Sequence, residues 1–421
     1  MRETLLHTPE GVRDIYGTEC EKKIALVNSI HHVLHLYGYH DIETPSFEFF
    51  DIFNYDKGSA PSNLMYKFFD RNNNTLVLRP DITPSIARCT AKYYQDEELP
   101  IRLCYSGKTY INAPMHQGKL NEISQIGCEL INDDSSAADA EMISSIVDCL
   151  KASGLKEFQI EIGDVDFFKG LMEEAGVSDD IEEKIRDFIQ IKNFFGLSEY
   201  VETLNISDNL KKCFKEFDTL FGGEEVLDKA ASYTTSKRAL EAIDRLRKVY
   251  KAVSYYNYEN YIDFDFSTLN GYDYYTGIVF SGYTYGTGDA IVKGGRYNNL
   301  LPQFGKDAPS IGFAVVIDEL FMALSRQHLD KETKSDITVI LYNIEDQEDA
   351  IYLAEKLRNK NVKTQLIRKS KRHDFNEYKE YASRNKVDKI YYFLGCADCI
   401  IYKTKDLSEE TKTLSEIREE I

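Results

Sequence analysis

The chain has 421 residues, of which 43% are hydrophobic, and its formal net charge is −19. This length and hydrophobic content favour a globular protein of two or three domains and exclude an intrinsically disordered chain. The acidic balance argues against nucleic acid as a partner, because a surface that binds phosphates needs cationic side chains to displace their counterions.

The sequence carries no recognisable membrane or export signal. No apolar run reaches the roughly 18 residues that a membrane-spanning helix needs. The N-terminus, MRETLLHTPEG, lacks the apolar region of a signal peptide. We therefore expect a cytoplasmic protein that has no membrane partner.

The eight cysteines are scattered along the chain, and Cys396 and Cys399 form the only close pair. A zinc site would need a second such pair, so we interpret the cysteines as reduced thiols, with a redox-active Cys396–Cys399 pair as the alternative.

Residues 1–160 alternate helical and strand-like segments. A helix near 20–36 is followed by the β-like stretch DIETPSFEFF. The next stretch, LVLRPDITPSIARCTAKYY, indicates a strand that turns sharply into a helix. Thr83 is predicted to cap this helix, and Pro84 suits its first turn because the missing N–H is not needed there.

A strand, a loop and a second strand are predicted over 102–131, where RLCYSG and ISQIGCELI flank a stretch of turn-forming residues. The loop is a natural place to bind a ligand. Its possible cations are Lys108, His116 and Lys119, and it contains no arginine.

The remaining sequence divides into three parts. Residues 166–260 are charged, with apolar positions three and four apart, which predicts a helical insertion. Strand-like segments return up to about 330, where the first domain is expected to end. Residues 335–421 have the order βαβαβ, which predicts a separate small α/β domain with parallel strands.

Several polar residues are predicted to meet on one sheet face. Gln125 and Glu129 are four apart on one strand and therefore face the same side. Asp81 ends another strand, and Tyr274 and Tyr275 lie on a third. This set suits a small cationic or amphoteric ligand, although such groups are often simply hydrogen-bonded neighbours.

Motifs of other enzyme classes are missing. The sequence has no Ser-His-Asp pattern, no HExxH and no phosphate-binding GxGxxG or GxxxxGK[ST] motif. The eight histidines show no evident metal-ligand spacing. We therefore expect no metal and no cofactor, and the residues alone indicate only a cytoplasmic α+β protein with a polar ligand pocket.

The order of seven motifs resembles the catalytic core of histidyl-tRNA synthetase, over about residues 8–326. This resemblance implies an α+β fold of the class II synthetase type, with an antiparallel sheet, flanking helices and a helical insertion. The C-terminal unit resembles a degenerate form of the synthetase anticodon-binding domain. The motifs are TPEGVRD, ETPSFE, LRPDITP, the hairpin ending QIGCE, YDYYTGIVF, GGRYNNL and IGFAV.

The chain departs from the synthetase pattern where that pattern has catalytic arginines. The resemblance places Ile111, Asn270 and Glu319 at three such positions, and Lys119 at a fourth. Adenylate formation needs preorganised positive charge, and the loss of one such donor costs on the order of 10²–10³ in rate. The hairpin is therefore expected to retain the scaffold without the ATP chemistry.

The amino-acid side of the pocket is better preserved. The chain resembles the regulatory subunits of ATP phosphoribosyltransferase, which are synthetase paralogues. This resemblance implies that the chain is non-catalytic and forms a homodimer within a hetero-oligomer. The chain would activate a short-form catalytic subunit and bind histidine as feedback effector. A working histidyl-tRNA synthetase and a synthetase-like amino-acid ligase are the alternatives. The implied histidine-binding residues are Asp81, Thr83, Gln125, Glu129, Tyr274 and Tyr275.

Overall fold

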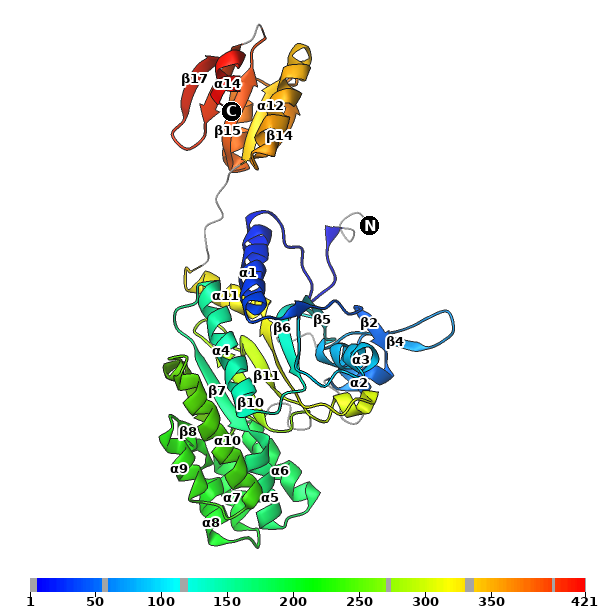
Figure 1. The fold of residues 1–421 in the computed structure, drawn as a ribbon, viewed down its shortest axis with the longest axis vertical. Helices are drawn as coiled ribbons and strands as arrows, with labels where there is room; N and C mark the ends of the chain where they lie inside the picture. The colour runs from blue at the N-terminus through cyan, green and yellow to red at the C-terminus, as the bar shows by residue number, and fades with distance from the viewer. Residues whose placement is uncertain are drawn as a thin grey trace. The chain divides into compact units, whose positions relative to one another are not determined.

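The computed structural model describes residues 6–54, 60–113, 120–269, 274–329, 337–395 and 398–420. It divides the chain into two compact units, Met1–Lys331 and Glu332–Ile421 (Figure 1). Each unit has hydrophobic clusters of its own, as expected of separate domains.

A nine-stranded sheet forms the centre of the first unit. Neighbouring strands pair antiparallel, except for the parallel pair at one edge, between residues 40–41 and 103–104, and a second parallel pair, between residues 160–162 and 262–264. In order across the sheet, the strands are β1 (His40–Asp41), β5 (Ile101–Tyr110), β6 (Glu122–Ile131), β12 (Ser310–Val316), β11 (Val292–Arg296), β10 (Ile278–Tyr283), β7 (Gln159–Asp164), β9 (Ile262–Asp265) and β8 (Phe221–Gly222).

Long helices pack on one face of this sheet. Ile126, Cys128 and Leu130 alternate along β6 and are all buried in the main core cluster on this face. The covering helices are α1 (Gly17–Leu36), α4 (Ser136–Ser153) and α11 (Ile317–Arg326) (Figure 1).

The opposite face of β5 and β6 belongs to a second cluster, which includes Leu103 and Tyr105. It is covered by α3 (Thr83–Tyr93) and by the 3₁₀ helix η5 (Leu301–Phe304). The predicted cap of α3 is wrong. Thr83 is the first residue of the helix, and the carboxylate of Asp81 accepts the N–H groups of Ile82, at 2.6 Å, and Thr83, at 3.3 Å.

Apart from the short strand β8, the segment between β7 and β9 is mainly helical, and it forms the green part of Figure 1. The amphipathic character of its helices follows from apolar residues spaced three and four apart, such as Ala242, Ile243 and Leu246, which are buried. The helices are α5 (Val165–Ala175), α6 (Asp179–Gln190), α7 (Phe194–Glu202), α8 (Asp208–Lys215), α9 (Glu225–Ala231) and α10 (Lys237–Ser254).

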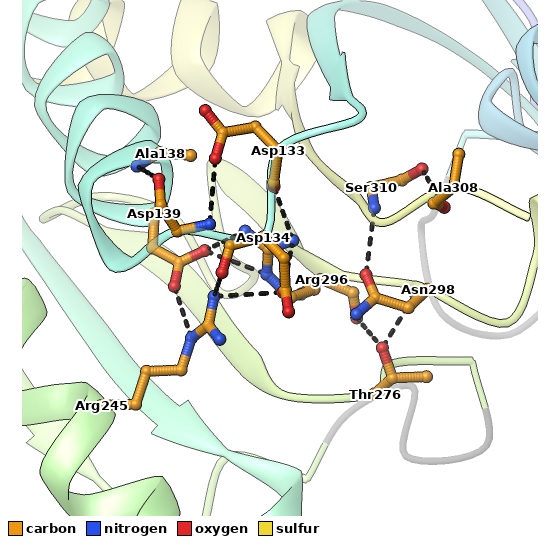
Figure 2. Close-up of polar contacts among 11 residues, drawn as sticks. Asp133, Asp134, Ala138, Asp139, Arg245, Thr276, Arg296, Asn298, Ala308 and Ser310 are labelled. Carbon is orange, nitrogen blue, oxygen red and sulfur yellow. Dashed lines mark hydrogen bonds and ion pairs between the residues drawn. The ribbon is translucent and has the colours of Figure 1, made fainter. Parts of the chain in front are cut away.

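A buried ion-pair network ties this insertion to the sheet (Figure 2). Asp139 of α4 is fully buried and accepts from Arg296 of β11, at 2.5 and 3.0 Å, and from Arg245 of α10, at 2.7 Å. Arg296 is 1% exposed and also donates to the carbonyl of Asp133. Asp134 adds a second carboxylate, 3.2 Å from Arg296 and 3.4 Å from Arg245, so the two cations of the network face two anions.

A small three-stranded sheet lies beside α3. Its strands are β2 (Phe47–Phe49), β4 (Thr75–Leu78) and β3 (Lys67–Phe69), in this order. The short helices that pack near it are α2 (Asp51–Asn54) and the 3₁₀ helix η2 (Ser62–Leu64).

The second unit is a five-stranded sheet in the order β14 (Lys363–Arg368), β13 (Ile337–Tyr342), β15 (Val387–Phe393), β16 (Asp398–Lys403) and β17 (Ser408–Thr413). β13 pairs parallel with both β14 and β15, through α12 (Gln347–Asn359) and α13 (Phe375–Arg384), so the predicted βαβαβ order is confirmed. The antiparallel strands β16 and β17 and the helix α14 (Leu414–Glu420) extend it.

Among the described residues of both units, no helix is both long and apolar enough to span a membrane.

Candidate ligand-binding site

Glu129 lies at the centre of the candidate site. It projects from β6 towards the α3 face and is 1% exposed. Its Oε1 accepts a hydrogen bond from the hydroxyl of Thr83 at 2.7 Å, and its Oε2 accepts one from the hydroxyl of Tyr297. The structure therefore brings Thr83 and Glu129 together, although they are 46 residues apart in the sequence.

Asp81 precedes α3 at the same site. Its carboxylate is held by the first N–H groups of the helix, where the positive end of the helix dipole favours an anion. Arg79 fixes the chain just before it, donating to the carbonyls of Lys108 and Thr44, both at 2.8 Å. A Cβ at Gly107 would lie 2.3 Å from the Arg79 guanidinium, so this anchorage requires a glycine in β5.

Three tyrosine rings line the site. Tyr274 contacts Tyr275 edge-on, with centroids 5.1 Å apart, and Tyr297 at 5.6 Å. Tyr275 and Tyr297 both pack into the cluster beneath α3. Sequence reasoning missed Tyr297; its position in GGRYNNL, directly after the end of β11, was the available signal.

Two buried polar atoms at the site have no hydrogen-bond partner among the described residues. They are Oε1 of Gln125 and the hydroxyl of Tyr274. Gln125 lies on the same strand face as Glu129, about 13 Å further along β6 at the usual rise per residue. Gly127 lies between them on this face, and the Tyr105 ring covers it, because a Cβ at Gly127 would lie 2.7 Å from the Tyr105 hydroxyl.

The site is electrostatically unusual because it gathers anions. The pKa of Glu129 is raised to about 8, chiefly by burial; the hydroxyls of Tyr297 and Thr83 oppose this shift, and the nearby Asp81 adds to it. Burial also raises the pKa of Asp81. No cationic side chain in the described part of the chain forms an ion pair with either carboxyl group. The site therefore suits a ligand that brings its own positive charge.

The cations expected in the hairpin do not supply that charge. Lys108 lies on β5 rather than in the loop, on the face opposite Glu129, and pairs with Glu122 at 2.7 Å. His116 and Lys119 lie outside the described residues, as does Asn270.

The two remaining positions from the synthetase comparison have different surroundings. Ile111 packs half-buried against an apolar cluster that contains Phe53, Met65 and Val77. Glu319 is a half-buried residue in the first turn of α11.

A second cleft, of about 640 Å³, lies on the helix-covered side of the sheet and is lined by residues of the N-terminal segment, α1, β5 and β6. Its charges compensate one another. Lys23 contacts Asp318 at 2.6 Å, and Asp318 also accepts the N–H of Ser124 at 2.7 Å. None of the predicted site residues lines this cleft.

Comparison with known proteins identifies the family of the chain. Residues 11–320 match the family model for histidyl-tRNA synthetase. A protein of Acetivibrio thermocellus named ATP phosphoribosyltransferase regulatory subunit is 37% identical over 417 residues, 99% of both chains. A protein of the same name from Ruminiclostridium cellulolyticum is 37% identical over 407 residues, 96% of this chain and 97% of the other.

Solved structures of related proteins have the same fold as this chain. A Bacillus halodurans protein, described as an ATP phosphoribosyltransferase regulatory subunit/histidyl-tRNA synthetase, superposes with a TM-score of 0.85 at 30% identity, covering 93% of this chain and 99% of that one. Histidyl-tRNA synthetase from Nostoc superposes with a TM-score of 0.80 at 18% identity over 99% of each chain, which supports the fold alone.

The predicted class II synthetase-like α+β fold is therefore confirmed, and the chain belongs to the family of ATP phosphoribosyltransferase regulatory subunits, which acts in histidine biosynthesis.

Proposed function

We propose that the chain binds free histidine in the pocket around Glu129 and passes this signal to a short-form catalytic subunit of ATP phosphoribosyltransferase. In this role it activates the catalytic subunit, mediates feedback by histidine, and forms no histidyl-adenylate itself.

The single observation that carries the proposal is the buried carboxylate of Glu129. It accepts hydrogen bonds from two hydroxyls but has no cationic partner among the described residues. An isolated buried carboxylate is costly unless a counter-charge approaches it. The ammonium or imidazole N–H groups of histidine would provide such a partner, as a charge-assisted hydrogen bond worth roughly 1.5–3 kcal/mol.

The other predicted residues complete a polar shell for the same ligand. The unpartnered Oε1 of Gln125 and hydroxyl of Tyr274 are available to a zwitterion of this size. Asp81 is the second anion and Thr83 holds Glu129 in place. Tyr275 and Tyr297 supply the aromatic wall.

The absence of adenylate formation rests on charge. A triphosphate needs cations where its negative charge develops. At two positions where the synthetase pattern has arginine, this chain has the apolar-packed Ile111 and the acidic Glu319. Neither side chain can stabilise a phosphate.

We further propose that the chain forms a homodimer through the segment ETPSFEFFDIF. Phe47 and Phe49 of β2 share one face of the small sheet with Phe68 of β3, and the three are 51%, 54% and 37% exposed. The rings of Phe47 and Phe68 lie 5.8 Å apart. Phenyl rings gathered at this density on a surface are typical of an interaction site.

Calorimetric titration of histidine into the purified chain tests the pocket. Glu129→Gln keeps the shape but cannot ionise to meet a cationic ligand, so it should weaken binding at least about tenfold. Glu161→Gln is the control, because Glu161 is a half-buried carboxyl of the same sheet whose pKa is also raised, but it lies on β7, away from the pocket. Equal histidine affinity in wild type and Glu129→Gln would place the effector site elsewhere.

A further inference from the structure

A cluster of four potential metal ligands lies on the helix-covered side of the sheet, away from the Glu129 pocket. It consists of His31, His35, Asp41 and Cys104. Cys104 occupies β5 between Leu103 and Tyr105 but points to the opposite face, into the core beneath α1. The cluster is therefore independent of the proposed histidine site.

Local structure explains why these residues meet. His31 and His35 are one turn apart on α1 and face the same side. The chain then reverses at Gly38, whose φ of +78° favours glycine, and enters β1. Asp41 of β1 pairs in register with Cys104 of β5, so that their side chains project side by side beneath the end of the helix.

The donor atoms already converge. Asp41 Oδ1 contacts His31 Nε2, Asp41 Oδ2 lies 3.1 Å from His35 Nε2, and Cys104 Sγ lies 3.5 Å from Asp41 Oδ1. One donor atom from each residue lies within 4.8 Å of all the others. Tetrahedral zinc, with bonds of about 2.0–2.3 Å, needs donors roughly 3.3–3.8 Å apart, so shifts of about 1 Å would complete the geometry.

The surroundings provide both a rigid base and an entry path. Cys104 is fully buried at the bottom of the cluster. The side chains of His31, His35 and Asp41 are 30%, 44% and 61% exposed, so an ion can reach them from solvent.

We propose that these four residues bind one divalent transition-metal ion of the zinc type. Two imidazoles, a thiolate and a carboxylate suit zinc, whereas magnesium and calcium prefer oxygen ligands alone. Binding releases the thiol proton to solvent and links the end of α1 to β1 and β5. The sequence predicted no metal site; the His31–His35 spacing of one helical turn was the signal for it.

The test uses the full-length chain, treated with a chelator and kept reduced. Titration with Co²⁺ should show one tetrahedral ion per chain with a thiolate charge-transfer band. Zn²⁺ should displace this spectrum and raise the unfolding temperature, because it binds the folded state.

Variants locate the site. Cys104→Ser should abolish the charge-transfer band, and His35→Ala should weaken Co²⁺ and Zn²⁺ binding at least about tenfold and remove the thermal shift. His32→Ala, the exposed neighbour on the same helix, should match wild type. Because His35 is exposed, its variant should fold even if Cys104→Ser does not, and circular dichroism checks this. The proposal is overturned if the chain binds neither ion or if His35→Ala binds both as wild type does.

Discussion

Gly312 of β12 lies directly opposite Glu129 of β6, and the carboxylate occupies the space that a side chain at 312 would need. A Cβ at this position would lie 1.6 Å from Oε2 of Glu129. The position of the buried carboxylate therefore depends on a glycine on the neighbouring strand.

Gly312→Ala should displace Glu129 from its hydroxyl partners. We expect a loss of roughly 1–3 kcal/mol in the free energy of unfolding, typical of overpacking, and at least tenfold weaker histidine binding. Urea denaturation and calorimetry measure the two effects. Gly288→Ala is the control, since a Cβ there meets nothing within 4 Å. If Gly312→Ala and Gly288→Ala have the same free energy of unfolding, the strands can separate without cost, and the prediction is contradicted.

The stability of the free chain should fall as pH rises through neutrality. The pKa of Glu129 is raised from 4.5 to about 8 by burial, so between these values the folded state binds a proton that the unfolded state has lost. Each pH unit in this window costs the fold up to about 1.4 kcal/mol, and the effect ends above pH 8.

Glu129→Gln should remove this contribution, because an amide does not titrate. The difference in unfolding free energy between the variant and wild type should therefore increase from pH 5 to pH 8 in the variant's favour. Parallel pH profiles of the two proteins in urea denaturation would contradict the raised pKa.

Asp139→Asn should be among the most destabilising single substitutions in the first unit. It removes the fully buried charge that pairs with both Arg296 and Arg245 and leaves these cations only the largely exposed Asp134. Breaking a buried pair typically costs about 3–5 kcal/mol. Asp244→Asn breaks only the exposed pair with Lys248 and should change stability by less than about 1 kcal/mol. Similar denaturation midpoints for the two variants would contradict the structural role of the network.

The sequence predicted those parts of the fold that follow from local pattern. The strands of the hairpin, the helical insertion and the shared face of Gln125 and Glu129 all follow from periodicity. The contact of Glu129 with Tyr297 spans 168 residues and that of Arg296 with Asp139 spans 157, and no local pattern carries such pairings. The prediction that Thr83 caps α3 is wrong for a related reason. The Thr83 hydroxyl donates a hydrogen bond to Glu129 instead, and the carboxylate of Asp81 accepts the N–H of Ile82 at the start of the helix.

The chain should not activate histidine. Histidine-dependent exchange of pyrophosphate into ATP should remain at background, because Ile111 and Glu319 cannot stabilise phosphate charge. An active histidyl-tRNA synthetase assayed in parallel shows that the conditions suffice. Exchange at a synthetase-like rate would instead favour a working synthetase or an amino-acid ligase.

The central claim is tested most directly by combining the chain with the short-form catalytic subunit from the same genome and measuring transferase activity across a range of histidine concentrations. We predict that the catalytic subunit alone is poorly active, that this chain activates it, and that histidine inhibits the complex. The Glu129→Gln chain should still activate but require at least about tenfold more histidine for inhibition. Transferase activity that is the same with and without the chain would contradict the account.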